Sequence, residues 1–185
     1  MKKMCGISGI VNQNNKPVLA QTIQTMINCM KHRGPDDEGI YLDFNVGFGF
    51  VRLSILDLSA AGNQPMYSRD KRYVIVYNGE VYNYIELKNE LKHKYEFFTG
   101  TDTEVVLAAY QEWGENCLHR FNGMFAFVVY DIKSKEIFGA RDRFGIKPFY
   151  YYHCNNKFIF ASEIPPTCDD MFNTWYSTLL VLSVN

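Results

Sequence analysis

The sequence predicts an α+β fold, a sandwich of β-sheets covered by helices. Residues 73–77 and 124–130 are apolar on both faces, which is typical of strands that are covered on both sides. Residues 125–131 and 136–141 flank a short turn and predict a hairpin. Strand pairs and helices follow one another in blocks rather than as strict βαβ units, and this order favours a sandwich over a doubly wound sheet.

A first helix is predicted after Pro17, because proline is favoured close to a helix N-terminus. Its buried stripe would consist of apolar residues at helical spacing: Leu19, Ile23, Met26, Ile27 and Met30. Two further helices are predicted over residues 84–95 and 102–113. Thr101 and Glu104 have the spacing of a capping box at the start of the latter helix.

The strand predicted over residues 46–52 carries an arginine at the end of an apolar row. Because side chains alternate along a strand, Phe48, Phe50 and Arg52 lie on the same face. An unpaired guanidinium on such a face would be costly, so Arg52 requires a carboxylate partner, either from the protein or from a ligand.

The C-terminal segment differs in composition from the rest of the chain. Residues 164–185 contain no Lys, Arg or Glu, whereas the preceding residues contain all 19 basic residues. Pro165 and Pro166 stand near its start and are incompatible with a continuing helix. The segment can be interpreted as one amphipathic or buried strand, or as out-of-frame or truncated sequence.

Length and composition predict one globular domain. The 185 residues suffice for one core, and 47% hydrophobic with 21% charged residues exclude a disordered chain. A net charge of −1 offers no basic excess for nucleic acid, and no apolar run is long enough for a membrane span or a secretory signal. The five cysteines form no CxxC pair, so we expect a cytoplasmic protein without a disulfide framework or a metal site.

Cys5 is a candidate nucleophile. It lies beside Gly6 and near Gly9, where the backbone can approach a ligand closely, although most free cysteines are small buried core residues. No histidine is near it in the sequence, so the base would be another group. A free α-amino group titrates at about 8 and could accept the thiol proton, provided that Cys5 is the first residue.

Three acidic or amide positions are further candidates. Asn78 with Gly79 predicts either a tight turn, for which Asn-Gly is a strong signal, or an oxyanion hole formed by the amide and a backbone N–H. Glu80 and Asp102 could bind an ammonium group. Asp102 is alternatively a first-turn acid that complements the helix dipole.

Taken together, these motifs resemble the glutamine amidotransferase domain of the asparagine synthetase family, the class with an N-terminal cysteine nucleophile. The matching stretches occur in the family's order: residues 4–7, 32–36, 52–57, 78–80, 100–104 and 140–148. The His-Arg-Gly-Pro-Asp loop and the Arg-Asp-Arg-Phe-Gly-Ile-Lys-Pro run are more similar to asparagine synthetases than to the phosphoribosyl or fructose-6-phosphate amidotransferases.

The resemblance implies a four-layer αββα sandwich of two mainly antiparallel sheets, the N-terminal nucleophile hydrolase fold. It implies that Cys5 attacks the carboxamide of L-glutamine, that ammonia is released, and that water hydrolyses the resulting thioester. Asn78 and Gly79 would form the oxyanion hole. The substrate-binding set implied in this way comprises Arg52 for the α-carboxylate, Glu80 and Asp102 for the α-ammonium, and the backbone of Leu53, Ser54, Ile55 and Leu56 as the lining.

The resemblance assigns residues 4–164 to the amidotransferase domain and leaves residues 165–185 as an atypical tail. In the family a synthetase domain follows, which uses ATP and Mg²⁺ to activate aspartate, and no cofactor is expected in the present chain. The expected function is hydrolysis of glutamine to glutamate and ammonia as the glutaminase part of an asparagine synthetase. A synthetase domain or subunit would be the ammonia acceptor, and a homodimer is a further expectation.

The second hypothesis is a catalytically silent glutamine-binding or interaction module. Met1 to Met4 precede the nucleophile, and while they remain, the nitrogen of Cys5 is a non-basic amide. A start at Met4 followed by removal of the initiator methionine would instead make Cys5 the first residue.

Overall fold

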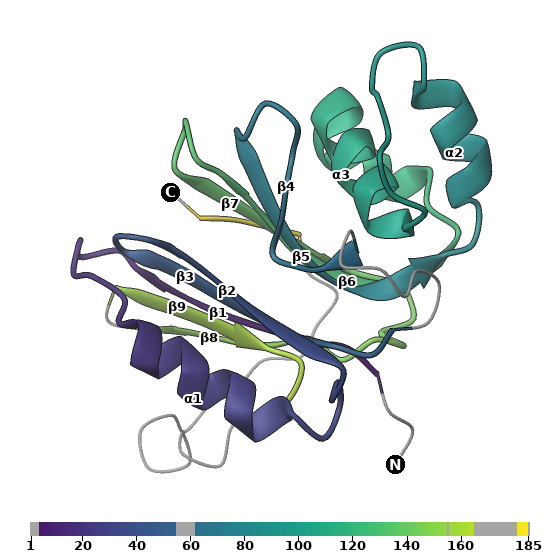
Figure 1. The fold of residues 1–185 in the computed structure, drawn as a ribbon. Coiled ribbons are helices and arrows are strands. Elements are labelled where there is room, and N and C mark those ends of the chain that lie inside the picture. The colour runs from purple at the N-terminus through teal and green to yellow at the C-terminus, as the bar shows by residue number, and fades with distance from the viewer. Residues whose placement is uncertain (1–3, 55–61, 155, 165–180, 185) are drawn as a thin grey trace.

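Two five-stranded sheets face each other between helices in the computed structural model, which describes residues 4–54, 62–154, 156–164 and 181–184 (Figure 1). All strand pairs within the two sheets are antiparallel. Helix α1 (Ala20–Met30) lies against the outer face of the first sheet, and α2 (Tyr84–Leu91) and α3 (Asp102–Trp113) lie on the side of the second. The predicted αββα sandwich is therefore confirmed.

The strand order brings segments that are distant in sequence side by side. The first sheet contains, in order, β2 (Asp37–Asp43), β3 (Val46–Arg52), β1 (Gly6–Asn12), β9 (Lys157–Ala161) and β8 (Tyr150–Cys154). The second contains β10 (Val181–Val184), β7 (Glu136–Arg141), β6 (Gly123–Asp131), β5 (Tyr73–Val81) and β4 (Met66–Tyr67). A 3-10 helix (Gly114–His119) follows α3. Cys5 thus directly precedes the central strand of the first sheet.

The main core fills the space between the sheets with aromatic and β-branched side chains. Phe48 and Phe50 of β3 and Phe160 of β9 are fully or almost fully buried there, against Val76 and Val128 of the second sheet. Burial of each such side chain contributes about 2 kcal/mol to folding. The apolar row that the alternation along β3 predicts is therefore present, and it leads towards Arg52.

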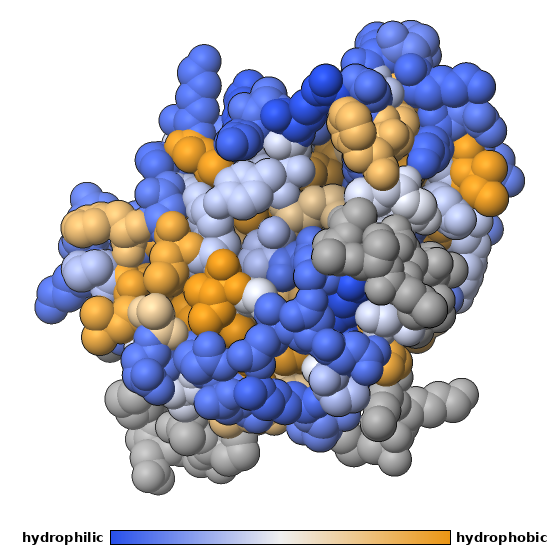
Figure 2. Space-filling model, in the orientation of Figure 1, coloured by the Kyte–Doolittle hydropathy of each residue, from blue (hydrophilic) through white to orange (hydrophobic). Residues whose placement is uncertain are grey.

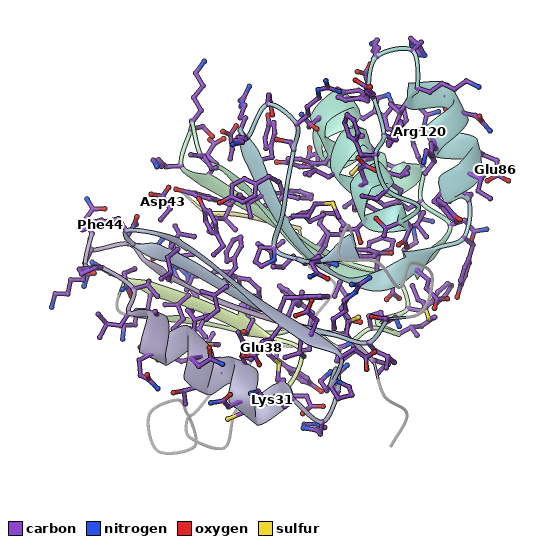
Figure 3. All side chains as sticks on the ribbon, in the orientation of Figure 1. Lys31, Glu38, Asp43, Phe44, Glu86 and Arg120 are labelled. Carbon is purple, nitrogen blue, oxygen red and sulfur yellow. The ribbon has the colours of Figure 1, made fainter. Side chains whose placement is uncertain are left out.

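Helix α1 covers the first sheet with the predicted stripe, apart from its first member. Ile23, Met26, Ile27 and Met30 are buried, whereas Leu19 is 65% exposed. Leu19 is the N-cap, and its extended backbone turns the side chain away from the face that the helix shares with the sheet. Beyond the C-terminal end of α1, Lys31 forms a 3.1 Å ion pair with Glu38 of β2 (Figure 3).

Helix α3 has the predicted bounds, but two predictions around it are wrong. Helix α2 ends at Leu91 rather than at residue 95, because Leu91 is its last buried apolar residue and charged residues follow. The Thr101 side chain makes no capping bond. Glu104 instead accepts hydrogen bonds from the N–H groups of Phe98 (3.0 Å) and Thr99 (2.9 Å), and so fixes the loop before the helix.

The surface carries scattered apolar side chains, some of which gather over the first sheet on the face shown in Figure 2. Strand β2 and the turn after it expose Ile40, Leu42 and Phe44. No helix in the described part of the chain is long and apolar enough to cross a membrane. Within the compositionally distinct C-terminal segment, residues 181–184 form β10 and pair with β7, which agrees with the interpretation as a strand for that part.

Candidate active site

Six of the predicted site residues line one pocket, which lies where β1 begins and where β3 and β5 approach the start of α3. They are Cys5, Arg52, Leu53, Gly79, Glu80 and Asp102. The pocket holds about 500 Å³ of space not filled by atoms, part of it open to solvent. Ile55 and Leu56 lie outside the described residues, and Ser54 and Asn78 do not line the pocket directly.

The thiol of Cys5 is held by the backbone of Leu53. Its Sγ accepts a hydrogen bond from Leu53 N–H (3.3 Å) and lies 3.5 Å from the Leu53 carbonyl oxygen, to which the thiol can donate. Burial raises the pKa of the Cys5 thiol, while the Leu53 N–H and the charges of Lys147 and Arg52 act in the opposite direction. The thiol is therefore partly buried but faces groups that favour its ionised form.

The loop over residues 32–36 fixes the backbone around the thiol, a role that the sequence did not suggest. Arg33 donates from Nε to the Cys5 carbonyl (3.1 Å), and its own carbonyl accepts Met4 N–H (3.0 Å). Asp36 accepts Ser54 N–H at Oδ2 (2.8 Å). The loop thereby joins the residue before β1 to the residues after β3.

Arg52 lies in the pocket at the end of the apolar row, and only 7% of it is exposed. Its Nη1 donates to Asn63 Oδ1 at 2.5 Å. The guanidinium also packs closely on Gly62, where an added Cβ would come within 2.6 Å of Nη2. A side chain at position 62 would push the arginine out of place, so the glycine permits this position of the guanidinium.

Asp102, the first residue of α3, is buried and bonded to β5. Its Oδ2 accepts hydrogen bonds from Tyr77 Oη (2.5 Å) and Val81 N–H (2.9 Å). Burial raises the pKa of Asp102, the two hydrogen bonds lower it, and the charge of Glu80 adds to the rise. No ion-pair partner of Asp102 occurs among the described residues.

Gln64 supports the same wall of the pocket and was not identified from the sequence. Its Oε1 accepts Tyr77 N–H (2.6 Å) and its Nε2 donates to the Tyr77 carbonyl (3.1 Å), as a neighbouring strand would. A lone glutamine in a loop gives no sequence signal for this role.

The alternative of a tight turn at Asn78 and Gly79 is wrong. Both residues lie inside β5, opposite Ala126 and Phe125 of β6. At Gly79 a Cβ would come within 2.7 Å of the Met124 carbonyl oxygen, so the strand pair leaves no space for a side chain. Asn78 is 1% exposed, and its Nδ2 has no hydrogen-bond partner among the described residues. A buried amide donor without an acceptor is rare, and it suits an oxyanion hole.

Lys147 is a second group near the nucleophile that the sequence reasoning missed. It is buried, with 6% exposed, and its Nζ lies 3.6 Å from Met4 Sδ. The signal that could have found it is the run over residues 141–148, which matched the family resemblance without a role.

Comparison with known proteins shows the family of the chain. A family model described as glutamine amidotransferase domain matches residues 4–174. A protein of Methanocaldococcus jannaschii named as a glutamine-hydrolysing asparagine synthetase is 49% identical over 179 residues, covering 87% of this chain and 34% of that protein. Glutamine-hydrolysing asparagine synthetase 1 of Bacillus subtilis is 47% identical, covering 86% of this chain and 26% of that protein. The chain thus spans 34% and 26% of the length of these two relatives.

A solved structure shares the fold. Glutamine phosphoribosylpyrophosphate amidotransferase from Bacillus subtilis superposes with a TM-score of 0.72 at 21% identity, covering 95% of this chain and 44% of that one. The likeness at this identity concerns the fold alone, whereas the family match extends over the residues that build the pocket. The chain belongs to the glutamine amidotransferase domain family, and relatives named as glutamine-hydrolysing asparagine synthetases are among the proteins it matches.

Proposed function

We propose that this chain hydrolyses L-glutamine to glutamate and ammonia through Cys5, as the glutaminase part of an asparagine synthetase. The observation that carries the proposal is the convergence of a thiol, a guanidinium and two carboxylates on one pocket: Cys5, Arg52, Glu80 and Asp102. A free amino acid carries one carboxylate and one ammonium. The guanidinium of the pocket complements the carboxylate, and the two carboxylates of the pocket complement the ammonium.

The charges in the pocket divide the binding of glutamine between two walls. The Arg52 guanidinium, which Asn63 and Gly62 hold in place, would bind the α-carboxylate with its fork of donors. The α-ammonium would lie against Asp102 and Glu80. Since Asp102 is buried without an ion-pair partner among the described residues, a bound ammonium would supply the missing positive charge.

In the proposed reaction the Cys5 thiol transfers its proton to a base, and Sγ forms a bond to the carboxamide carbon. The negative charge that develops on the carboxamide oxygen is stabilised by the Asn78 amide and a backbone N–H at Gly79. When the tetrahedral intermediate collapses, the C–N bond breaks and the leaving nitrogen takes the proton from the base, releasing ammonia. Water then hydrolyses the glutamyl thioester and restores the thiol.

The proposed base is the α-amino group of Cys5, which requires that Met1 to Met4 are removed. With them in place, Met4 N–H donates to the Arg33 carbonyl at 3.0 Å and the Cys5 nitrogen is an amide. This contact favours the second candidate, a glutamine-binding module without turnover. An intact mass of the chain from its native host separates the two, because a mass without four N-terminal residues supports the hydrolase and retention of all four supports the silent module.

The experiment that tests the hydrolase is a glutaminase assay on two chains that both begin at position 5, one with the native Cys5 and one with Cys5→Ala. The Cys5→Ala variant should lose at least about 10⁴-fold in rate, as expected when a nucleophile is removed, and should still bind glutamine by calorimetry. Cys117→Ala is the matched control, since that thiol lies in a separate cluster and burial raises its pKa to about 12. Hydrolysis that persists without the Cys5 thiol would overturn the mechanism.

The ammonia would pass to a synthetase domain or subunit that amidates aspartate, in the cytoplasm. The similarity to relatives named as asparagine synthetases, which continue well beyond the part matched by this chain, supports this acceptor. Asparagine formation from ¹⁵N-amide glutamine in a cell extract, lost when this chain is deleted, would test it.

A further inference from the structure

The ammonium of Lys147 is buried with few polar partners. Only 6% of the residue is exposed, and the one hydrogen-bond acceptor near Nζ in the described part of the chain is the thioether Met4 Sδ, at 3.6 Å. A thioether is a weak acceptor, and an ammonium has three donors to satisfy. A buried cation with so few partners is costly unless a negative charge comes close to it at some stage.

The position of Lys147 does not depend on Met4, because the loop that carries it is held by its own hydrogen bonds. After β7, Asp142 accepts the N–H groups of Phe144 (3.1 Å), Ile146 (2.9 Å) and Lys147 (3.0 Å). Arg141 donates from Nε to the Lys147 carbonyl (2.6 Å). The backbone of residue 147 is therefore fixed by contacts that do not involve Met4.

The charges around Lys147 come from several elements. Burial lowers the pKa of Lys147 most strongly, and Arg33 after α1 acts in the same direction. Glu80 of β5, the Cys5 sulfur and Asp142 act in the opposite direction and favour the ammonium form. Glu80 and Cys5 also line the pocket.

Lys147, like Arg52, is a cation that favours the ionised form of the Cys5 thiol. Four contributions oppose the burial that raises the pKa of the Cys5 thiol: the Leu53 N–H, the Lys147 charge, the Arg52 charge and a hydrogen bond to the backbone of Cys5 itself. Arg52 already has Asn63 as a partner and would have the substrate carboxylate. Of the charges that favour the Lys147 ammonium, Glu80 contributes most and the Cys5 sulfur is next.

We propose that Lys147 is the electrostatic partner of the Cys5 thiolate. Its ammonium keeps its own proton and stabilises the negative charge that forms on Sγ when the thiol proton leaves. This deepens the proposed hydrolysis, and its catalytic meaning rests on that function. Lys147 acts on the reaction only through the charge of Cys5, and it neither donates nor accepts a proton.

The test is the pH profile of Cys5 reactivity towards 4,4′-dithiodipyridine in the full chain, with the Cys5→Ala chain as the background of the other four cysteines. In Lys147→Met the apparent pKa of Cys5 should rise by about one pH unit. Because a more basic thiolate is also a better nucleophile, the net result is a rate about threefold lower near neutral pH. At alkaline pH, where wild-type Lys147 loses its charge, the variant should react no more slowly than the wild type. Lys133→Met, an exposed lysine on the β6–β7 turn, is the control and should leave the profile unchanged.

Two outcomes overturn the proposal. One is an unchanged profile in Lys147→Met, and the other is a rate lowered by the same factor at every pH, which would indicate altered access rather than charge. If Lys147→Met does not fold, Lys147→Arg replaces it, and a loss of the wild-type rate near neutral pH in a folded Arg variant also overturns it. Failure of glutamine hydrolysis in the wild-type chain would contradict the proposed function and leave this thiol profile as an independent result.

Discussion

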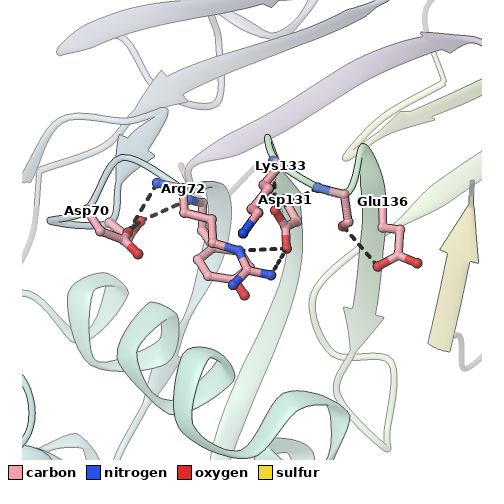
Figure 4. Close-up of polar contacts among 8 residues, drawn as sticks. Asp70, Arg72, Asp131, Lys133 and Glu136 are labelled. Atoms are coloured by element: carbon pink, nitrogen blue, oxygen red, sulfur yellow. Dashed lines mark hydrogen bonds and ion pairs between the residues drawn. The ribbon is translucent and has the colours of Figure 1, made fainter.

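Asp131, the last residue of β6, and Asp102, which is bonded to β5, are both buried aspartates. Their pKa values are shifted in opposite directions. Asp131 closes the β6–β7 turn, where its Oδ2 accepts two hydrogen bonds from Arg72, from Nε (3.0 Å) and Nη2 (2.6 Å) (Figure 4). Its Oδ1 accepts the N–H groups of Lys133 (2.9 Å) and Ser134 (3.1 Å). Although burial opposes it, these partners lower the pKa of Asp131 to about 2.

Asp102 receives a phenol and one backbone N–H but no cation among the described residues, and burial raises its pKa. The contrast extends to its neighbours, since Asn78 Nδ2 lacks an acceptor in the described chain and Lys147 contacts a thioether. Asp131 thus has its charge balanced by the protein itself, whereas Asp102 at the pocket leaves its charge for a ligand.

The largest effect on catalysis is expected at Asn78, whose amide would donate a hydrogen bond to the oxyanion. Asn78→Ala should lower kcat for glutamine hydrolysis by about 10²–10³-fold, the usual effect of removing one oxyanion donor. It should lower the unfolding temperature only by what the lost packing costs, because Nδ2 donates no hydrogen bond in the described structure. Steady-state kinetics and thermal unfolding measure the two effects. An unchanged kcat would remove Asn78 from the oxyanion hole.

The next effect is expected at Asp102. Asp102→Asn keeps an oxygen that can accept from Tyr77 and Val81 but removes the negative charge, so KM for glutamine should rise by about 10²-fold. Because the pKa of Asp102 is raised in the folded state, its carboxyl loses stabilising effect as pH rises through that pKa, and the variant should lack this decline. Glutamine titrations and unfolding at several pH values check both points; an unaltered KM would exclude ammonium binding by Asp102.

The smallest effect is expected at Asp131, where a substitution should change stability and not glutamine binding. The pKa of Asp131 is lowered to about 2, so its contribution is complete above the ordinary value of 3.8 and is lost as pH falls towards 2. Since Arg72 is partly exposed, we expect Asp131→Asn to cost about 1 kcal/mol at neutral pH. Urea unfolding at neutral and acidic pH measures this difference, which should vanish at the acidic end. KM for glutamine should stay unchanged, and a raised KM would show that the two regions are coupled.

Local periodicity predicted most of the fold and part of the site. Alternation along residues 46–52 was enough to identify Arg52 as an inward charge, and the helical stripe identified the buried face of α1. The errors occur where the structure depends on a contact outside the predicted element itself. Asn78 with Gly79 reads as a turn until β6 is placed beside it, and Glu104 reads as part of a capping box until the loop at Phe98 folds over it.

Lys147 and Gln64 could not be found from local sequence patterns, because their roles depend on contacts made only in the folded chain. Lys147 lies 142 positions after Cys5 in the sequence, and the loop that carries it is shaped by hydrogen bonds to Asp142 and from Arg141. Gln64 takes the place of a neighbouring strand through its side chain, for which no sequence pattern exists. Both depend on how sheets and loops pack rather than on periodicity.

The pairing of β10 with β7 has a consequence for solubility. Residues 181–184 cover the backbone of β7 along Ile137 to Ala140, so β7 is an interior strand. A chain cut before this segment would expose the N–H and C=O groups of β7 as an open edge, which can recruit a strand from a second molecule. The oddly composed C-terminal segment would in this way protect the sheet against aggregation.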